Sequence, residues 1–337
     1  MKYLSAVLLL LFMHSSYARD YYYGTALDGE KKEFNGTADM HSKFISTVRK
    51  NKAYWEGLLA KMERLIKELE EKILVTGDKI KKNNIQDDLY KLINNKAHCL
   101  ILLNREDEAL EILKDLEKKL PGESKFAENL AFCYEKKKDY DRALHWIQIA
   151  MNRDSMSAYS NIWVYEKILI ARQKLSKDPK YLSENRITDI DIPMDKELLP
   201  LNFSDRDSYH IRWKLANKAK HIRERIQLQM QRNPMSGDPV IACLTEELAT
   251  IYAICSVCEV ALPVFELAAN GHPIPELVQS RIDQMKRLIA SNPRSMDYSR
   301  SIFEKISKSA WVIGVSFGLL ILLIGYLWWK DRKPKAV

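Results

Sequence analysis

The sequence predicts an all-α fold, and two observations carry this prediction. Apolar residues recur every three or four positions along most of the chain, whereas no run of alternating β-branched residues bounded by turns stands out. Gly and Pro, which interrupt helices, number only 11 each among 337 residues. The chain is long enough for one elongated helical region or two smaller ones.

Residues 1–18 have the layout of a secretory signal peptide. Lys2 supplies the positive start, and an apolar core at residues 4–13 is too short to span a bilayer. Ser16 and Ala18 place small side chains at the two positions that a signal peptidase inspects. We therefore expect cleavage after Ala18 and export of the chain.

Residues 311–329 have the composition of a transmembrane helix. The segment contains no charged residue, and as a helix it would be about 28 Å long, close to the thickness of the hydrocarbon layer. Trp311 and Trp329 stand at its ends, where amphipathic rings prefer the membrane interface. The basic tail at 330–337 predicts a cytoplasmic C-terminus, so the region before the span should lie outside the cytoplasm.

Two aspects of this anchor stay open at the level of sequence. Gly314 and Gly318 form a GxxxG pair through which two copies could dimerise. The membrane is either the bacterial inner membrane, with the exported part in the periplasm, or that of the endoplasmic reticulum, with the exported part in the lumen. We favour the bacterial envelope, although the tail at 330–337 resembles a dilysine retrieval signal.

Residues 19–85 precede the regular part of the chain. Residues 19–38 combine three tyrosines, glycines and mixed charges, and we expect a loosely ordered lead there. Residues 39–74 predict a long amphipathic helix or helix pair, in which Trp55, Met62 and Leu69 are seven apart. This helix could form a coiled coil with another helix or pack onto the segment that follows it.

Residues 86–175 contain a repeated pattern of small and apolar side chains. Ala109 and Ala143 are 34 residues apart, and each is followed by apolar residues at matching positions. Ala261 sits in a similar pattern later in the chain. Small side chains are needed where two antiparallel helices cross closely.

This pattern resembles the tetratricopeptide repeat family, in units at residues 89–121, 126–155 and 241–273. The family's first-helix Trp is replaced by Ile93, Ala127 and Thr245. The resemblance implies a solenoid of antiparallel helix pairs that binds other proteins and rarely carries chemistry.

An irregular linker separates the two halves of the chain. Residues 176–207 contain Pro179, Pro193 and Pro200, and long irregular segments tend either to be functional or to cover a groove. Residues 208–308 form a C-terminal helical region that includes the third unit. Near its start, Arg223, Glu224 and Arg225 are typical of a mixed-charge helix surface.

The phase of the units predicts a concave face made by the first helix of each unit. Its expected solvent-facing residues are Asn94, Asn95, His98, Glu128, Asn129, Phe132, Glu246 and Glu247. The asparagines there could hold the backbone of a protein or peptide partner, and Phe132 could supply an apolar contact.

The sequence offers no catalytic residues, cofactor site or metal site, so we expect a binding protein and not an enzyme. The net charge of +8 is spread over mixed-sign faces, which disfavours nucleic-acid binding. Cys255 and Cys258 form the one CxxC pair and are a candidate disulfide. Three alternatives remain: a thiol-active redox protein or enzyme accessory subunit, an adaptor in the endoplasmic reticulum lumen, and a structural homo-oligomer.

Overall fold

The computed structural model describes residues 21–35, 51–154, 160–191, 194–200, 206–232 and 237–292. The expected signal peptide, the expected transmembrane helix with Gly314 and Gly318, and the basic tail lie outside these residues. Among the described helices, none combines the length and the apolar character needed to cross a membrane. Helices are the main secondary structure of the described chain, as the sequence pattern predicts. One short β-hairpin is the exception.

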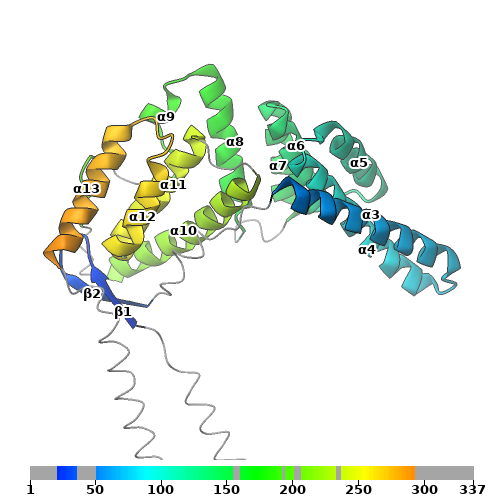
Figure 1. Ribbon diagram of the computed structural model, residues 1–337, viewed down its shortest axis with the longest axis horizontal. Helices are drawn as coiled ribbons and strands as arrows, with labels where there is room; N and C mark the ends of the chain where they lie inside the picture. The colour runs from blue at the N-terminus through cyan, green and yellow to red at the C-terminus, as the bar shows by residue number, and fades with distance from the viewer. Residues whose placement is uncertain are drawn as a thin grey trace, which may run out of the picture.

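The elements form an arch, with α3 to α7 in one limb and α8 to α13 in the other (Figure 1). Their bounds are β1 Tyr21–Thr25, β2 Lys31–Asn35, α3 Lys52–Val75, α4 Lys79–Leu102, α5 Glu106–Lys119, α6 Ser124–Lys136, α7 Tyr140–Arg153, α8 Ile162–Lys177, α9 Tyr181–Glu184, α10 Arg206–Arg232, α11 Pro239–Cys255, α12 Cys258–Ala268 and α13 Pro275–Ser291.

Helices α4 to α7 form two helix pairs that repeat the same turn 34 residues apart. Asn104 and Lys138 end the first helix of each pair, and both have a φ of 58°. The residue after each donates its amide to a carbonyl five residues earlier, Arg105 to Leu100 and Asp139 to Tyr134, both at 2.9 Å. This left-handed turn closes the first helix and reverses the chain.

Small side chains lie at the crossings within these pairs. Ala97 and Ala109 in the first pair, and Ala131 and Ala143 in the second, have no exposed surface. A larger side chain at any of them would separate the helices, which explains the 34-residue spacing of small residues in the sequence.

Helices α11 and α12 share this packing but not the turn. Ala249 and Ala261 are also fully buried at the matching positions. The chain between the two helices, however, passes through extended backbone at Val257, with φ of −138° and ψ of 155°, and has no residue of positive φ there. The third pair is therefore related to the first two by its core and not by its connection.

Helix α3 packs against α4 of its own chain, which is one of the two arrangements expected for the amphipathic segment, and residues 39–50 of that segment lie outside the described residues. Leu59 is buried in the same core cluster as Ala97 and Leu100 of α4, and Trp55 and Met62 pack against that cluster. The first half of the hydrophobic stripe of α3 is therefore covered within the chain, whereas Leu74 and Val75 at its end are exposed.

The β-hairpin corrects the expectation of a loosely ordered lead. Strands β1 and β2 pair antiparallel, with Tyr21 opposite Asn35. Thr25 donates its amide and its hydroxyl to the carboxylate of Glu259 on α12, both at 2.8 Å. Gly24 passes so close to α12 that an added Cβ would lie 2.7 Å from the Val257 side chain. The start of the described chain is thus fixed onto its last helices.

A close approach of two glycines yields a test of the fold. Gly271 has a φ of 90°, and an added Cβ would lie 2.5 Å from the Cα of Gly237. We predict that Gly271→Ala lowers the free energy of unfolding by about 1–3 kcal/mol. Gly57→Ala, at an exposed position of α3 with nothing within 4 Å, should raise it by roughly 0.5–1 kcal/mol. Thermal unfolding of the detergent-solubilised full chain would measure both, and equal melting temperatures would contradict the packing.

Candidate functional site

The eight residues expected on a concave face lie mostly inside the protein. Asn95 is exposed and His98 is half-buried. The exposure prediction is wrong for the other six, which are 0–9% exposed: Asn94, Glu128, Asn129, Phe132, Glu246 and Glu247. The physical reason is that other segments of the same chain cover the face that the repeat phase defines.

The predicted residues nevertheless stand at equivalent positions in the three helix pairs. Asn94, Glu128 and Glu246 each stand three residues before the small residue of their unit, which is Ala97, Ala131 or Ala249. Because three residues are close to one helical turn, each side chain lies beside its small residue on the same face. The sequence therefore identified equivalent positions, although it did not identify what covers them.

Four of the predicted residues meet between α4 and α6. The Nδ2 of Asn129 donates to the Oδ1 of Asn94 at 2.9 Å, and the Oδ1 of Asn129 lies 3.2 Å from the Nδ1 of His98. The rings of His98 and Phe132 have centroids 5.8 Å apart. These contacts join the first helices of the two pairs.

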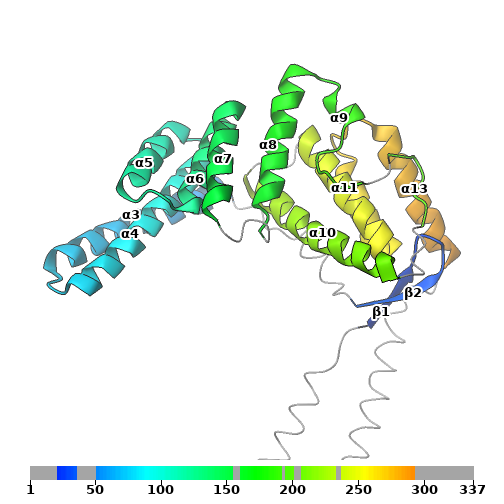
Figure 2. The same ribbon diagram turned by 180° about the vertical axis from the view of Figure 1, so that it is seen from behind.

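Arg225 of α10 covers the neighbouring carboxylate. Its Nη2 donates to Glu128 Oε1 at 3.0 Å and to Asn161 Oδ1 at 2.7 Å, and its guanidinium lies 4.6 Å from the ring centroid of Tyr165. Arg225 is 1% exposed, so the expectation of a solvated surface is wrong for this residue. Helix α10 is thereby tied to α6 and α8, and Figure 2 shows one end of α10 beside the lower end of α8.

A second carboxylate of α6 is held by α8. Glu135 is 3% exposed and accepts hydrogen bonds from the Tyr165 hydroxyl and from Arg172, the latter at 2.5 Å. Arg172 also bonds Asp238, the cap of α11, at 2.7 Å. This arginine therefore connects the two limbs of the arch.

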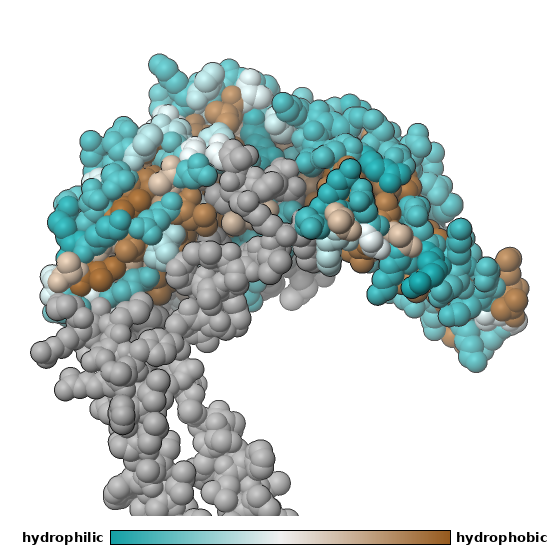
Figure 3. Space-filling model, viewed as in Figure 1, coloured by the Kyte–Doolittle hydropathy of each residue, from teal (hydrophilic) through white to brown (hydrophobic). Residues whose placement is uncertain are grey.

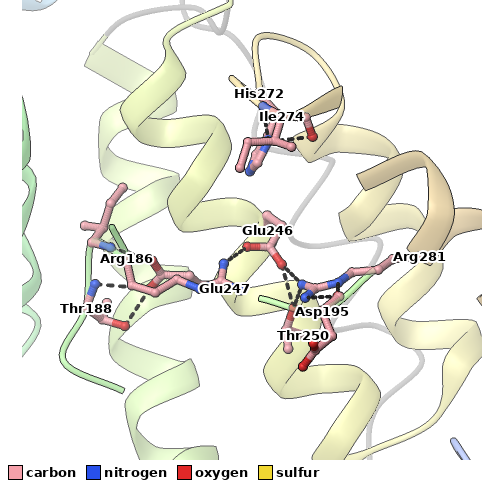
Figure 4. Close-up of polar contacts among 10 residues, drawn as sticks. Arg186, Thr188, Asp195, Glu246, Glu247, Thr250, His272, Ile274 and Arg281 are labelled. Atoms are coloured by element: carbon pink, nitrogen blue, oxygen red, sulfur yellow. Dashed lines mark hydrogen bonds and ion pairs between the residues drawn. The ribbon is translucent and has the colours of Figure 1, made fainter. Parts of the chain in front are cut away.

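A further polar cluster is buried around Glu246 of α11 (Figure 4). Glu246 is paired with both Arg186 of the linker and Arg281 of α13, and it accepts a hydrogen bond from Thr250 Oγ1 at 2.8 Å. Burial, together with the nearby Arg186, lowers the pKa of Arg281 to about 9, so Arg281 stays charged at neutral pH. The two arginines balance the charge of a glutamate that water does not reach.

Glu247 binds the linker through its backbone. Its carboxylate accepts hydrogen bonds from the amides of Ile187 at 2.6 Å and Thr188 at 3.1 Å, and from the Thr188 hydroxyl at 2.5 Å. Burial raises the pKa of Glu247, against the opposing effect of these donors.

Helix α13 binds a later part of the linker in the same way. Gln284 accepts from the amide of Leu198 at 2.9 Å and donates to its carbonyl at 2.8 Å, and Arg281 donates to the carbonyl of Asp195 at 2.8 Å. Side chains of α11 and α13 therefore hold the linker by its main chain, as a groove holds an extended peptide. The linker therefore packs on α11 and α13 of its own chain.

The candidate disulfide between Cys255 and Cys258 is not formed. No disulfide joins any of the five cysteines. Cys258 donates its thiol to the carbonyl of Ala26 in the β-hairpin at 3.7 Å, and burial raises its pKa to about 12. Cys258 follows the extended residue Val257 and begins α12 beside the hairpin.

Comparison with models of known protein families gave no match, and neither did comparison with curated protein sequences. Within the described residues, no three His, Cys, Asp or Glu side chains are grouped so that they could hold a metal ion. The resemblance to tetratricopeptide repeats thus rests on the residues and on the 34-residue recurrence described above.

The buried ion pair gives a prediction with a matched control. Arg281→Met should lower the free energy of unfolding by about 1.5–3 kcal/mol, because Glu246 and the Asp195 carbonyl lose a charged donor while Arg186 still pairs with Glu246. Arg287→Met, on the same helix, breaks a pair with Glu197 whose side chains are 61% and 62% exposed, and should cost less than about 1 kcal/mol. Denaturant unfolding of both variants checks this, and similar losses would contradict the role given to Arg281.

His272 gives a pH-dependent prediction. The ring is 6% exposed and its Nδ1 accepts from the Ile274 amide at 3.1 Å. Burial lowers the pKa of His272 from 6.5 to about 4. A lowered pKa contributes stability above pH 6.5 that is lost as the pH falls towards 4, about 2 kcal/mol between pH 7 and 5.

His272→Asn removes the titrating ring, and its Oδ1 can still accept from the amide two residues later. Between pH 7 and 5, the free energy of unfolding of this variant should fall by about 2 kcal/mol less than that of the wild type. Unfolding curves at the two pH values test this, and an unchanged pH dependence would be the contrary result.

Proposed function

We propose that this chain is an exported, membrane-anchored protein of the tetratricopeptide-repeat type that binds another protein. The single observation that supports this most strongly is the recurrence of the same left-handed turn at Asn104 and Lys138, together with fully buried alanines at the crossings. Helix pairs of this kind are stacked to present surfaces, and they seldom carry reactive groups. The anchor and the export signal are proposed from the sequence at residues 311–329 and 1–18.

The surface proposed for the partner is the outer side of α10. Trp213 is 59% exposed and Ile211 is 48% exposed, although α10 belongs to the folded part of the chain through Ala219, Ile222 and Ile226. An exposed tryptophan on a fixed helix is the side chain most often found to dominate a protein interface. The inner faces are already filled by the chain itself, so the partner is expected on this outer side.

A thiol-active protein is the alternative from another class, and the cysteines give it little support. Burial raises the pKa of Cys133, Cys243 and Cys258 to about 12 in each case. Redox cysteines need the opposite shift, because the thiolate is the reacting species. The location in a bacterial envelope or in the endoplasmic reticulum is kept as proposed from the sequence, with the first preferred.

Affinity capture of the full chain from solubilised membranes tests the proposal. Wild-type protein should retain a specific partner, and Trp213→Ala should weaken its binding about 30-fold, the loss typical of a central interface residue. Tyr54→Ala, which changes another exposed aromatic residue at 45% exposure, is the control and should bind as the wild type does. Equal retention by all three chains, or retention of further copies of this chain alone, would contradict the proposal.

A further inference from the structure

The tip of the α3–α4 hairpin carries three large apolar side chains that face solvent. Leu74 and Val75 at the end of α3 are both 83% exposed, and Ile80 in the first turn of α4 is 73% exposed. A three-residue turn, residues 76–78, joins the two helices. Figure 3 shows apolar surface gathered at this end of the arch.

The same tip is strongly basic. Lys72, Lys79, Lys81 and Lys82 are all exposed, and none of them forms an ion pair within the described part of the chain. Asp78 is the only acidic residue between positions 72 and 82. Its Oδ1 caps α4 by accepting from the amides of Ile80 and Lys81 at 2.8 and 3.1 Å. Four lysines and one aspartate within residues 72–82 leave an excess of positive charge beside the apolar side chains, and Glu70 and Glu71 lie one helical turn before Leu74 and Val75.

We propose that this tip, residues 72–82, is a membrane-contact site for a bilayer surface rich in anionic lipid. Leu74, Val75 and Ile80 enter the boundary between headgroups and acyl chains, and the lysines bind the headgroup phosphates. Aliphatic side chains with a basic surround suit a fluid anionic surface, which adapts to any apolar shape. A protein partner would more often be recognised by an aromatic or arginine anchor, and the tip has neither.

The position of the tip agrees with contact to the membrane that holds the proposed anchor. Asn292, at the end of α13, donates its side-chain amide to the carbonyl of Gly29 in the β-hairpin. This end and the tip are the two feet of the arch, and both point to the same side in Figures 1 and 2. The orientation of the tip towards this membrane rests on the proposed anchor, whereas binding of the tip to anionic lipid does not.

A fluorophore at the apex of the turn tests the proposal in the full chain. Gly77→Cys places the label where an added Cβ has nothing within 4 Å, and Gly57→Cys, equally open, is the reference position. Both are made with Cys255→Ser, because Cys255 is the one cysteine that is not fully buried. The protein is reconstituted in vesicles of phosphatidylcholine, with or without phosphatidylglycerol, and quenching by nitroxide-bearing lipid is measured.

The proposal predicts quenching of the label at position 77 in the anionic vesicles, with little at position 57. Each change of Lys79, Lys81 or Lys82 to Gln should lower the ratio of bound to free tip about fivefold. Leu74→Asn with Val75→Asn should abolish the quenching, whereas Leu199→Asn, at a position 78% exposed elsewhere, should not change it.

Equal, low quenching at both positions in both vesicles would overturn the proposal. So would a signal in phosphatidylcholine that depends on protein density, since it would mean that tips bind one another. Flotation of the chain with residues 311–329 deleted separates this test from that of the anchor. If the tip binds anionic lipid, the shortened chain should float with anionic vesicles only, whether or not residues 311–329 span a membrane.

Discussion

The structure depends on the neutralisation of carboxylates that lie inside it. Glu128 and Glu135 of α6, and Glu246 and Glu247 of α11, are all less than 9% exposed. A carboxylate removed from water costs several kcal/mol unless cations or hydrogen-bond donors replace the lost hydration. Here Lys125 and Thr250 donate from the same helices, and the other donors come from α10, α8, α13 and the linker. The positions of these four segments are therefore fixed by charge as well as by apolar packing.

The buried groups also explain how much of the structure the sequence could predict. Alanines at matching positions revealed the helix pairs, because a close helix crossing admits only small side chains. The same spacing identified the face on which Glu128 and Glu246 lie. It could not show that this face is covered, since Arg225 is 97 residues from Glu128 and its neighbours Arg223 and Glu224 give it the pattern of a surface helix.

Two further differences between sequence and structure have local causes. The three consecutive tyrosines of β1 do not alternate with polar residues, so the β-hairpin lacks the pattern by which a strand is recognised. The third helix pair uses extended backbone at Val257, and this turns Cys258 towards Ala26 of the hairpin. One cysteine of the CxxC motif that sequence spacing made a candidate disulfide thus contacts the β-hairpin instead.

The burial of the predicted binding residues bears on the proposed function. Main-chain atoms of the linker form hydrogen bonds with the side chains of Glu247, Gln284 and Arg281. Contacts of this kind can hold a peptide regardless of its own side chains. Because the linker is part of the same chain, its local concentration is high, and a free peptide would compete poorly. The arrangement favours a protein whose inner faces are structural and whose outer faces are available to partners.

Site-resolved amide hydrogen exchange of the linker tests this account most directly. The amides of Ile187, Thr188 and Leu198 donate to Glu247 and Gln284, so they should exchange far more slowly than the amide of Gly77, which lies in an exposed turn. Glu247→Ala should accelerate Ile187 and Thr188 while leaving α4 and α6 protected. Exchange of the linker amides at the rate of Gly77 in the wild-type protein would show that α11 and α13 do not hold the linker.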